Sequence, residues 1–296
     1  MTGTTNFSDI LAPLEQAAPG LLSAPAPQYL QEPRGYFAGR AIALARPRTT
    51  EETALCIRTA VAGNIAVIPY AGGTGLVGGQ VRPDDSPAMI LSLERMARIR
   101  ELSDADQTMV AEAGAILADV QHAAQQKGLL FPLSLASEGS CRIGGNLATN
   151  AGGVNVLRYG NTRDLCLGLE AVMPDGTILN NLKSLRKDNT GYDIRHLLIG
   201  SEGTLGVITA ARLRLFARPV ERATGFLTVP DPASALTLLR RLQAVFGEAI
   251  SAFELIDRTG VDFVRETLPD IAIPGVELAR WHVLVELGSG PGLDLN

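Results

Sequence analysis

Hydrophobic and polar positions along the first two thirds of the chain switch repeatedly between a helical period and short strand-like runs. The capping box Thr49-Thr-Glu-Glu52 opens a predicted helix over residues 50–61, and Gly63 follows its end. The other elements predicted in this part are strands at residues 65–68, 89–93 and 108–113 and a helix at 116–127. This alternation indicates helices packed on sheets.

The pattern predicts a second α/β unit after Pro219. Asp231 has the chemistry of an N-cap and Pro232 suits the first helical position, so we expect a helix that runs to Phe246. The remaining predicted elements are strands at residues 224–229, 251–256 and 281–287 and a helix that ends at 266. Their order is β-α-β-α-β, and a glycine-rich, turn-prone tail over residues 288–296 follows.

A glycine-rich segment, residues 69–79, directly follows the strand predicted at 65–68. Five glycines occupy the eight positions from Gly72 to Gly79. Glycine permits sharp turns and lets main-chain N–H groups approach an anion without a Cβ in the way, which favours a phosphate-binding loop. Within it, Gly73-Thr-Gly75-Leu-Val-Gly78 fits the G-x-G-x-x-G pattern of dinucleotide-binding folds.

That dinucleotide pattern also requires a helix directly after the loop and an acidic residue about 20 positions further on. Glu94 lies near the position of the acid, but Pro83 and Pro87 disfavour the helix. No lysine follows the glycines as a Walker A loop requires. A different nucleotide-binding architecture is therefore favoured, with an NAD(P)-binding module as a remote alternative.

Composition excludes several classes of function. The chain has 296 residues, 46% of them hydrophobic, enough for one large or two ordinary cores. Its net charge of −5 and pI of about 5.3 give no indication of a nucleic-acid or anionic-membrane partner. No apolar run is long enough for a membrane span, and residues 1–22 lack the features of a signal peptide, so we expect a cytoplasmic protein. Cys56, Cys141 and Cys166 lie far apart without a C-x-x-C motif and indicate neither a disulfide framework nor a zinc site.

Two further glycine-rich segments, residues 132–153 and 198–209, mix Gly with Ser, Thr and other polar residues. Such segments offer main-chain N–H groups together with hydroxyl, amide and carboxylate side chains. This combination suits a long polar ligand that carries phosphates and hydroxyls. We therefore expect one extended cofactor held by three segments.

Together, the three segments resemble the FAD-binding domain of the flavoenzyme superfamily of vanillyl-alcohol oxidase and p-cresol methylhydroxylase, the PCMH type. The runs Ser184-Leu-Arg-Lys-Asp-Asn-Thr-Gly-Tyr-Asp193, Ile199-Gly-Ser-Glu-Gly-Thr-Leu-Gly206 and Ser251-Ala-Phe-Glu254 are similar to its D-2-hydroxyglutarate dehydrogenase branch. D-lactate dehydrogenases and the FAD subunit of glycolate oxidase are close neighbours of that branch.

The resemblance implies an α+β fold in which a PCMH-type FAD-binding domain of two α/β subdomains precedes an incomplete α/β, ferredoxin-like cap domain. The FAD-binding domain is expected over residues 37–218 and the partial cap over residues 219–296. Residues 1–36, rich in Ala, Pro and Gln, are expected to be a lead-in segment.

The resemblance also implies which residues contact FAD. The loop at 71–79 would hold the pyrophosphate, residues 132–140 and 144–153 would line the isoalloxazine and ribityl chain, and residues 202–208 would make the last contacts. Thr74 stands where some relatives carry the histidine that binds flavin covalently, so FAD is expected to be non-covalent. The implied cofactor-binding residues are Pro69, Ala71, Gly72, Gly73, Thr74, Gly75, Leu76, Gly78, Gly79, Pro132, Leu133, Gly139, Ser140, Ile143, Gly144, Gly145, Asn146, Thr149, Asn150, Gly152, Gly153, Glu202, Gly203, Gly206 and Ile208.

The activity that the resemblance implies is FAD-dependent oxidation of a D-2-hydroxy acid, of the 2-hydroxyglutarate or lactate type, to the 2-oxo acid. In this family the Cα hydride passes to the flavin while a base takes the hydroxyl proton. The expected partners are a small 2-hydroxy-acid substrate and an electron acceptor, either an electron-transfer flavoprotein, a quinone or a cytochrome. A homodimer is a further expectation, and no nucleic acid is expected.

The motifs that supply the metal site and catalytic histidine of the relatives, His-x-x-Gly-Asp-Gly-Asn-x-His and Glu-His-Gly, do not occur in this sequence. We therefore expect that the chain ends part-way through the cap and that a divalent metal such as zinc belongs only to the full-length protein. No catalytic residue and no metal ligand is assigned. The alternative function is a non-catalytic FAD-binding fragment or an electron-carrier subunit.

Several tempting residues have plainer interpretations. We expect structural or surface roles for the three histidines, His122, His196 and His282. Arg186 and Lys187 could anchor a substrate carboxylate, but they lie in a polar stretch and a solvated role is favoured. The alternative for the glycine segments is tight turns and close packing, and the alternative for Glu202 is a capping or ion-pairing carboxylate.

Overall fold

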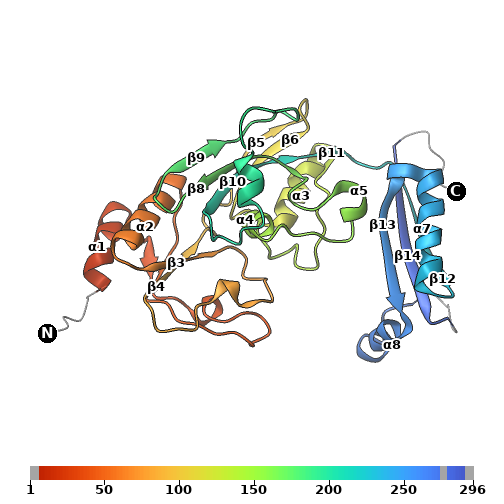
Figure 1. Cartoon of the computed structure of the whole chain (residues 1–296), viewed down its shortest axis with the longest axis horizontal. Helices are drawn as coiled ribbons and strands as arrows, with labels where there is room; N and C mark the ends of the chain where they lie inside the picture. The colour runs from red at the N-terminus through yellow and green to blue at the C-terminus, as the bar shows by residue number, and fades with distance from the viewer. Residues whose placement is uncertain (1–6, 274–278, 291–296) are drawn as a thin grey trace. The chain divides into compact units, whose positions relative to one another are not determined.

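The computed structural model describes residues 7–273 and 279–290, which divide into two compact units (Figure 1). The first unit contains the described residues up to 131 together with 136–151 and 162–216. The second contains residues 132–135 and 152–161 and the described residues from 217 onward. The sequence predicts one uninterrupted first domain over residues 37–218. In the structure, residues 132–135 and 152–161 lie within that range but belong to the second unit. The three-part division itself stays a prediction.

Most helices and strands belong to the first unit. Their bounds are α1 Phe7–Ala17, β1 Leu22–Ser23, β2 Ala43–Ala45, α2 Thr50–Ala62, β3 Ala66–Tyr70, β4 Ala88–Ser92, β5 Ile99–Ser103, β6 Thr108–Glu112, α3 Leu117–Gln126, β7 Leu129–Leu130, α4 Ile143–Ala148, β8 Cys166–Val172, β9 Ile178–Asn181, α6 Ile194–Leu198 and β10 Val207–Arg214. The short strand β11, Phe216–Ala217, ends this part of the chain. The elements of the second unit are α5 Val156–Tyr159, β12 Glu221–Val229, α7 Pro232–Phe246, β13 Ile250–Asp257, α8 Arg258–Thr267 and β14 Trp281–Ser289.

The first sheet has the strand order β1-β2-β4-β3, in which β2 and β3 run parallel to the central β4. Helix α2 precedes β3, and its predicted cap is confirmed. The Thr49 side chain accepts from the Glu52 N–H, and the Glu52 carboxylate accepts from the Arg48 N–H at 2.6 Å. These bonds satisfy two N–H groups at or beside the helix start, which fixes where α2 begins.

The connection from β3 to β4 contains no α-helix. A single 3-10 turn at Gly78–Gln80 is followed by irregular chain up to Ala88, as the two prolines predicted. Parallel neighbours need a long crossover connection, which is usually helical. Here the glycine-rich segment itself makes that connection, so it begins at the carboxyl end of β3.

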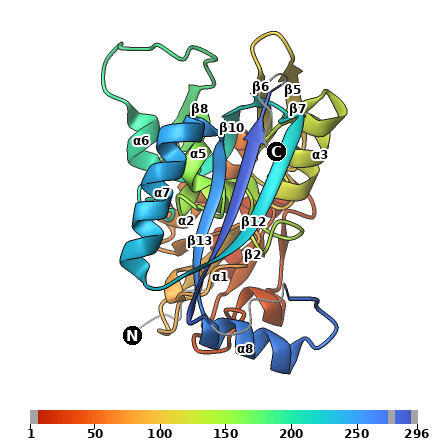
Figure 2. The same cartoon turned by 90° about the vertical axis from the view of Figure 1, so that its right-hand side faces the viewer.

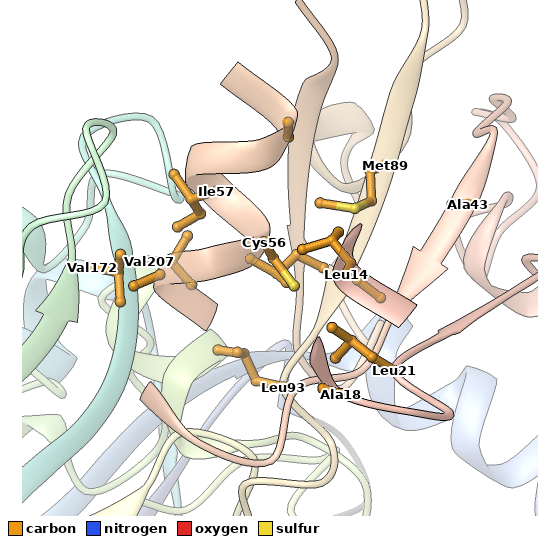
Figure 3. Packing of buried hydrophobic residues seen from close by; sticks show 14 of the residues in the cluster. Leu14, Ala18, Leu21, Ala43, Cys56, Ile57, Met89, Leu93, Val172 and Val207 are labelled. Carbon is orange, nitrogen blue, oxygen red and sulfur yellow. The ribbon is translucent and has the colours of Figure 1, made fainter. Parts of the chain in front are cut away.

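Helix α2 lies between the two sheets of the first unit (Figure 3). On one side, Ile57 faces Val172 and Val207 of the second sheet, and on the other Cys56 packs near Leu14 of α1. These side chains are buried and form one continuous apolar cluster with the first sheet. The helix therefore sets how the two sheets of this unit are spaced.

The predicted lead-in segment contributes to this core. Helix α1 buries Leu11 and Leu14, and Leu14 has no exposed surface. Tyr29, also in this segment, packs on the other face of the first sheet. Residues 7–36 are therefore part of the first unit, because their apolar side chains fill its core, while residues 1–6 lie outside the described residues.

The second sheet, with order β5-β6-β10-β8-β9, is antiparallel throughout and contains two buried carboxylates. Glu112 accepts from the side chains of Arg98 and Arg100, and Glu170 accepts from Arg100 at 3.1 and 3.2 Å. Arg100 thus bridges both carboxylates. Because each buried charge has cationic and hydrogen-bonding partners, the polar groups are compatible with an apolar surrounding.

The second unit is a three-stranded antiparallel sheet of order β12-β14-β13 with α7 along it (Figure 2). The predicted N-cap of α7 is confirmed, since the Asp231 carboxylate accepts from the Ser234 N–H at 2.7 Å. Val283 and Val285 of β14 pack under α7. The last strand extends to Ser289, two residues past its predicted end, and residues 291–296 of the predicted tail lie outside the described residues.

Candidate functional site: a cradle of three glycine-rich segments

The first glycine segment turns sharply just after β3. Gly73 has φ +65°, and a Cβ placed on it would overlap the Tyr70 hydroxyl. A Cβ on Gly72 would lie 2.6 Å from the Ser140 carbonyl oxygen, so the first loop packs closely against the second segment at Ser140. Only glycine fits at these two positions, for reasons of conformation and space.

Gly75 is different, because nothing in its surroundings requires glycine. Its φ is not in the left-handed region, and the nearest atom to a Cβ would be Gln80 Oε1, at an ordinary 3.4 Å. Gly75 and its neighbours Leu76 and Val77 are exposed, with Leu76 at 45% and Val77 at 59%. The outer part of the loop is therefore open to a ligand, while its inner part is fixed by the protein.

The second segment meets the first at the start of α4. Gly144 lies against Ala113, where a Cβ would be 2.7 Å from the Ala113 Cβ, and a Cβ on Gly145 would be 3.0 Å from Ala71 Cβ. Both glycines allow α4 to approach the sheet and the first loop closely. Ile143, one residue earlier, is 1% exposed, and its N–H donates to the Ala115 carbonyl at 3.0 Å, so it supports the cradle from within the protein.

The third segment closes on both of the others. A Cβ on Gly203, which has φ +79°, would lie 2.8 Å from Pro69 Cγ at the end of β3. The Glu202 N–H donates to the Ala148 carbonyl at 2.9 Å, and its Oε2 would be 3.3 Å from a Cβ on Gly79. The predicted convergence of three segments is therefore present in the first unit. We call the surface formed by residues 69–80, 139–150 and 200–206 the cradle.

One buried side-chain donor of the cradle segments lacks a hydrogen-bond partner among the described residues. Asn146 of α4 is 3% exposed, and its Nδ2 has no hydrogen-bond partner in the part of the chain that the structure describes. Buried donors are nearly always satisfied, so such an atom calls for a specific explanation. A bound ligand that supplies an acceptor is the explanation that fits its place among three glycine segments.

Thr149 and Asn150, the last predicted residues of the second segment within this unit, are occupied in holding the turn. The Thr149 hydroxyl donates to the Gly145 carbonyl at 2.9 Å. Asn150 has φ +49°, and its Oδ1 accepts from the Arg163 N–H at 3.0 Å. At Gly139 no atom lies within 4 Å of the position that a Cβ would take, so close packing does not require glycine there.

Four of the predicted cofactor-binding residues belong to the second unit. Pro132 and Leu133 lie in its segment 132–135, and Gly152 and Gly153 lie in its segment 152–161. These two segments pack on each other, because Asn155 Nδ2 donates to the Pro132 carbonyl at 2.9 Å. Their role toward a cofactor remains a prediction.

Glu94, the acidic residue required by the alternative dinucleotide-binding interpretation, has partners within the protein. Glu94, which lies near the place of a ribose-binding acid in a dinucleotide fold, accepts from Tyr29 Oη at 2.8 Å and pairs with Arg46 at 3.4 Å. Burial and this hydrogen bond raise the pKa of Tyr29 to about 12. The Glu94 carboxylate is thus used within the protein. This agrees with rejecting the dinucleotide interpretation.

No histidine lies within the cradle segments. His122 contacts Gln126 along α3, His196 is in α6 close to Asp193, and His282 is buried in β14 with its ring stacked on Phe226. Among the described residues no group of three His, Cys, Asp or Glu side chains is arranged to hold a metal ion. Arg186 and Lys187 are exposed, in agreement with the solvated role expected for them.

The three cysteines are buried and unpaired with one another. Burial raises the pKa of the Cys56 thiol and of the Cys166 thiol to about 12. Thiols of such high pKa are poor nucleophiles at neutral pH. The three cysteines act as small apolar residues of the core.

Some residues that hold the cradle could not be found from the sequence. Arg142 donates to the Gly114 carbonyl at 2.5 Å just before α4, and Gln80 Nε2 donates to the Gly73 carbonyl at 3.4 Å. Arg163 connects the second and third segments. The acceptors of Arg142 and Arg163 lie 13 to 36 residues away, and Gln80 reaches back across seven residues of its own loop. No local sequence pattern marks such contacts.

Comparison with known proteins gives the class of this domain. Residues 41–181 match a family described as the FAD binding domain. The solved structure of alkyldihydroxyacetonephosphate synthase has the same fold, with a TM-score of 0.77 and 20% identity over 95% of this chain and 56% of that chain. The fold and the three segments thus define an FAD-binding flavoprotein domain of the PCMH type. Within that class, the chain is similar over most of its length to proteins named as FAD-linked 2-hydroxy-acid dehydrogenases.

The curated relatives support that placement. The chain is 43% identical over 291 residues to the mitochondrial D-2-hydroxyglutarate dehydrogenase of Bos taurus, covering 97% of this chain and 53% of that protein. It is 33% identical to the D-2-hydroxyglutarate–pyruvate transhydrogenase of Saccharomyces cerevisiae, covering 90% of this chain and 54% of that protein. The chain spans about half the length of these relatives. The bovine protein is mitochondrial by name, so the comparisons give no support to the cytoplasmic expectation.

Within the described residues, no helix is both long enough and apolar enough to cross a membrane.

Proposed function

We propose that the chain binds FAD non-covalently in the cradle and serves the oxidation of a D-2-hydroxy acid to the corresponding 2-oxo acid. The observation that carries the proposal is the convergence of three glycine-rich segments on the end of β3, with the buried Asn146 amide lacking a partner among the described residues. D-2-Hydroxyglutarate is the preferred substrate class, because the bovine and the yeast relative both carry that compound in their names. D-Lactate is the alternative within the same chemistry.

The residues of the cradle would hold the cofactor in three ways. The N–H groups of the glycine loop suit the negative charge of a diphosphate, since amide dipoles converge where no Cβ intervenes. Gly144 and Gly145 let α4 approach closely, and Asn146 would donate to an acceptor on the cofactor. Thr74 offers a hydroxyl rather than an imidazole, so no covalent link to flavin is expected.

FAD, when bound, supplies the acceptor for a hydride. In the proposed reaction a base would take the hydroxyl proton of the hydroxy acid, its Cα hydride would leave with the electron pair to the cofactor, and the C=O bond would form. For the partner that would then take the electrons we keep an electron-transfer flavoprotein, a quinone or a cytochrome. None of the three histidines lies in the cradle segments, so we assign no base.

The second candidate is an FAD-binding or electron-carrier role without substrate oxidation. It is favoured by one observation, namely that the cradle segments contain no histidine to act as a base. Both candidates require bound FAD. They differ only in whether this chain reduces the flavin with a hydroxy acid.

One experiment separates the candidates. The purified protein is expected to be yellow and to release FAD into the supernatant on acid precipitation, whereas covalent flavin would stay with the pellet. Anaerobic mixing with D-2-hydroxyglutarate or D-lactate then follows the flavin absorbance. Bleaching would establish dehydrogenase activity for this chain, and unchanged absorbance would favour the carrier role. A colourless protein that takes up no added FAD would remove both.

A further inference from the structure

The second and third segments are joined directly by main-chain hydrogen bonds at the end of α4. The Gly200 N–H donates to the Leu147 carbonyl at 3.0 Å, and the Glu202 N–H donates to the Ala148 carbonyl at 2.9 Å. The last carbonyls of a helix lack intrahelical partners, so the Glu202 bond satisfies the Ala148 carbonyl, while the Leu147 carbonyl also accepts from the Asn150 N–H at 3.0 Å. These bonds bring the two segments together. They do not by themselves stabilise the neighbouring turns at Asn150 and at Gly200–Glu202, which need contacts from other groups.

Those flanking turns adopt conformations that need support. Asn150 has φ +49° and Glu202 has φ +51°, both in the left-handed region that non-glycine residues adopt at a cost of about 1 kcal/mol or more. Gly200, two residues before Glu202, is also in the left-handed region, with φ +84°. Such turns persist when surrounding contacts determine them strongly.

Arg163 makes these contacts on both segments at once. Its main-chain N–H donates to Asn150 Oδ1 at 3.0 Å and supports the left-handed turn of the second segment. Its guanidinium donates to the Ile199 carbonyl at 2.6 Å and to the His196 carbonyl, at the end of α6 and the entry to the third segment. The planar fork of an arginine is suited to two acceptors in this way.

The distance between the two contacts of Arg163, from its main-chain N–H to Asn150 and from its guanidinium to the Ile199 carbonyl, is fixed by the surrounding structure. Thr162, directly before it, is 1% exposed and donates its hydroxyl and its N–H to the Ala151 carbonyl, so the main chain here is held in place. The guanidinium fills the space beside Gly200, where a Cβ would lie 3.0 Å from its Nη2. The length of one side chain thus sets the distance between the Asn150 turn and the entry to the third segment.

We propose that Arg163 is a positioning residue of the cofactor site, which fixes the spacing of the second and third segments for FAD without touching the cofactor. The inference rests on the proposed function, because it requires FAD to bind in the cradle. It adds a residue that lies outside the three glycine-rich segments and that is defined by its contacts. Removing the guanidinium leaves the Asn150 contact and the apolar core intact but releases the third segment.

The test compares Arg163→Met and Arg163→Lys with the matched control Arg58→Met. Arg58 also donates its guanidinium to a backbone carbonyl, that of Gly176 at 3.1 Å, in the turn between β8 and β9. The affinity of each apo-protein for FAD is measured by quenching of flavin fluorescence, alongside the melting temperature without FAD and the fine structure of the bound flavin spectrum.

Arg163→Met is expected to weaken FAD binding about tenfold or more, while Arg58→Met stays within about twofold of wild type. The melting temperatures of the two apo-variants should fall by similar amounts. Arg163→Lys should recover part of the affinity, because an ammonium can reach one carbonyl but lacks the planar fork. The flavin bands of Arg163→Met should lose resolution, as expected for a looser site.

Equal FAD affinity in Arg163→Met and Arg58→Met would overturn the inference. So would a loss of affinity in Arg163→Met that only follows a larger drop in its apo melting temperature. If Arg163→Met does not fold, Arg163→Lys decides by the same comparison, where a wild-type affinity contradicts the proposal. Failure of the wild-type protein to bind FAD would count against the proposed function instead.

Discussion

The Thr50 hydroxyl donates a 2.7 Å hydrogen bond to the buried carboxylate of Glu170, which lies 120 residues further along the chain. Thr50 is the first residue of α2, and Glu170 lies in β8. The same Glu170 oxygen accepts from Thr209 of β10 at 2.9 Å. One carboxylate therefore holds the start of the central helix against two strands of the second sheet.

Replacement of Thr50 by Val should destabilise the protein by about 1–2 kcal/mol, because a methyl group of similar shape replaces one of the donors to the buried Glu170 carboxylate. Urea unfolding followed by far-UV circular dichroism measures this loss. Thr50→Ser keeps the hydroxyl and should lose much less. If the two variants were equally stable, the hydrogen bond would contribute nothing and only the methyl group would matter.

Stability should fall as the solution becomes acidic because of Glu170 and Glu112. Burial raises the pKa of each carboxyl, but the hydrogen bonds from Arg100 and its neighbours outweigh it, and each pKa is held below the ordinary value of 4.5. An acid with a lowered pKa in the folded state binds fewer protons there than in the unfolded chain. Its contribution is therefore full above the ordinary pKa and is lost as pH falls through the folded value.

Glu170→Gln provides the test of this acid dependence. The variant should be less stable than wild type near pH 7 but should lose less stability between about pH 5 and pH 3, since one titrating carboxyl has been removed. Chemical unfolding at a series of pH values gives both quantities. An identical acid dependence in the two proteins would show that Glu170 titrates alike in the folded and unfolded states.

The glycine loop offers a paired test of ligand approach. Gly75→Val should weaken FAD binding strongly while leaving the melting temperature of the apo-protein nearly unchanged, because only Gln80 lies near its Cβ and the φ angle is ordinary. Gly73→Ala should lower both, since its φ of +65° disfavours a side chain and the Tyr70 hydroxyl occupies the space. Unchanged flavin affinity in Gly75→Val would mean that the loop is a turn and no more.

Asn146 should show opposite effects on the free and the loaded protein. Asn146→Leu removes a buried donor that has no partner among the described residues, so the apo-protein should melt at or above the wild-type temperature. Its affinity for FAD should fall by about tenfold, as expected for one lost hydrogen bond in a buried site. Calorimetry and flavin titration test the two effects separately. A fall in stability with unchanged affinity would assign Asn146 to the fold alone.

Local signals in the sequence predicted local structure well. The capping residues Thr49 and Asp231 start their helices as expected, and Pro83 and Pro87 account for the missing helix after the loop. The three glycine-rich segments were predicted to act together because each offers the same chemistry. Their meeting around β3 depends on close approaches, such as Gly203 to Pro69, that residue type alone suggests but does not locate.

Long-range packing is what the sequence could not supply. Helix α1 has a weak local signal, with Pro13 inside it, yet Leu14 is fully buried against the core. The assignment of residues 132–135 and 152–161 to the second unit follows from tertiary contacts, which have no period along the chain. Arg163 is similar, since its acceptors lie 33 and 36 residues away.

The segment between β3 and β4 has two roles, because it connects two parallel strands and also forms part of the cradle. A circularly permuted protein with new ends between residues 71 and 87 would keep the paired strands, whose register runs from Ala66 opposite Ala88 to Tyr70 opposite Ser92, but would cut the binding surface. New ends at the turn around Gly176, between β8 and β9, would leave the β3–β4 segment whole. Genetic insertions and tags between β3 and β4 are therefore expected to disturb the cradle, whereas in most parallel sheets the same connection would be a helix that serves only as a spacer.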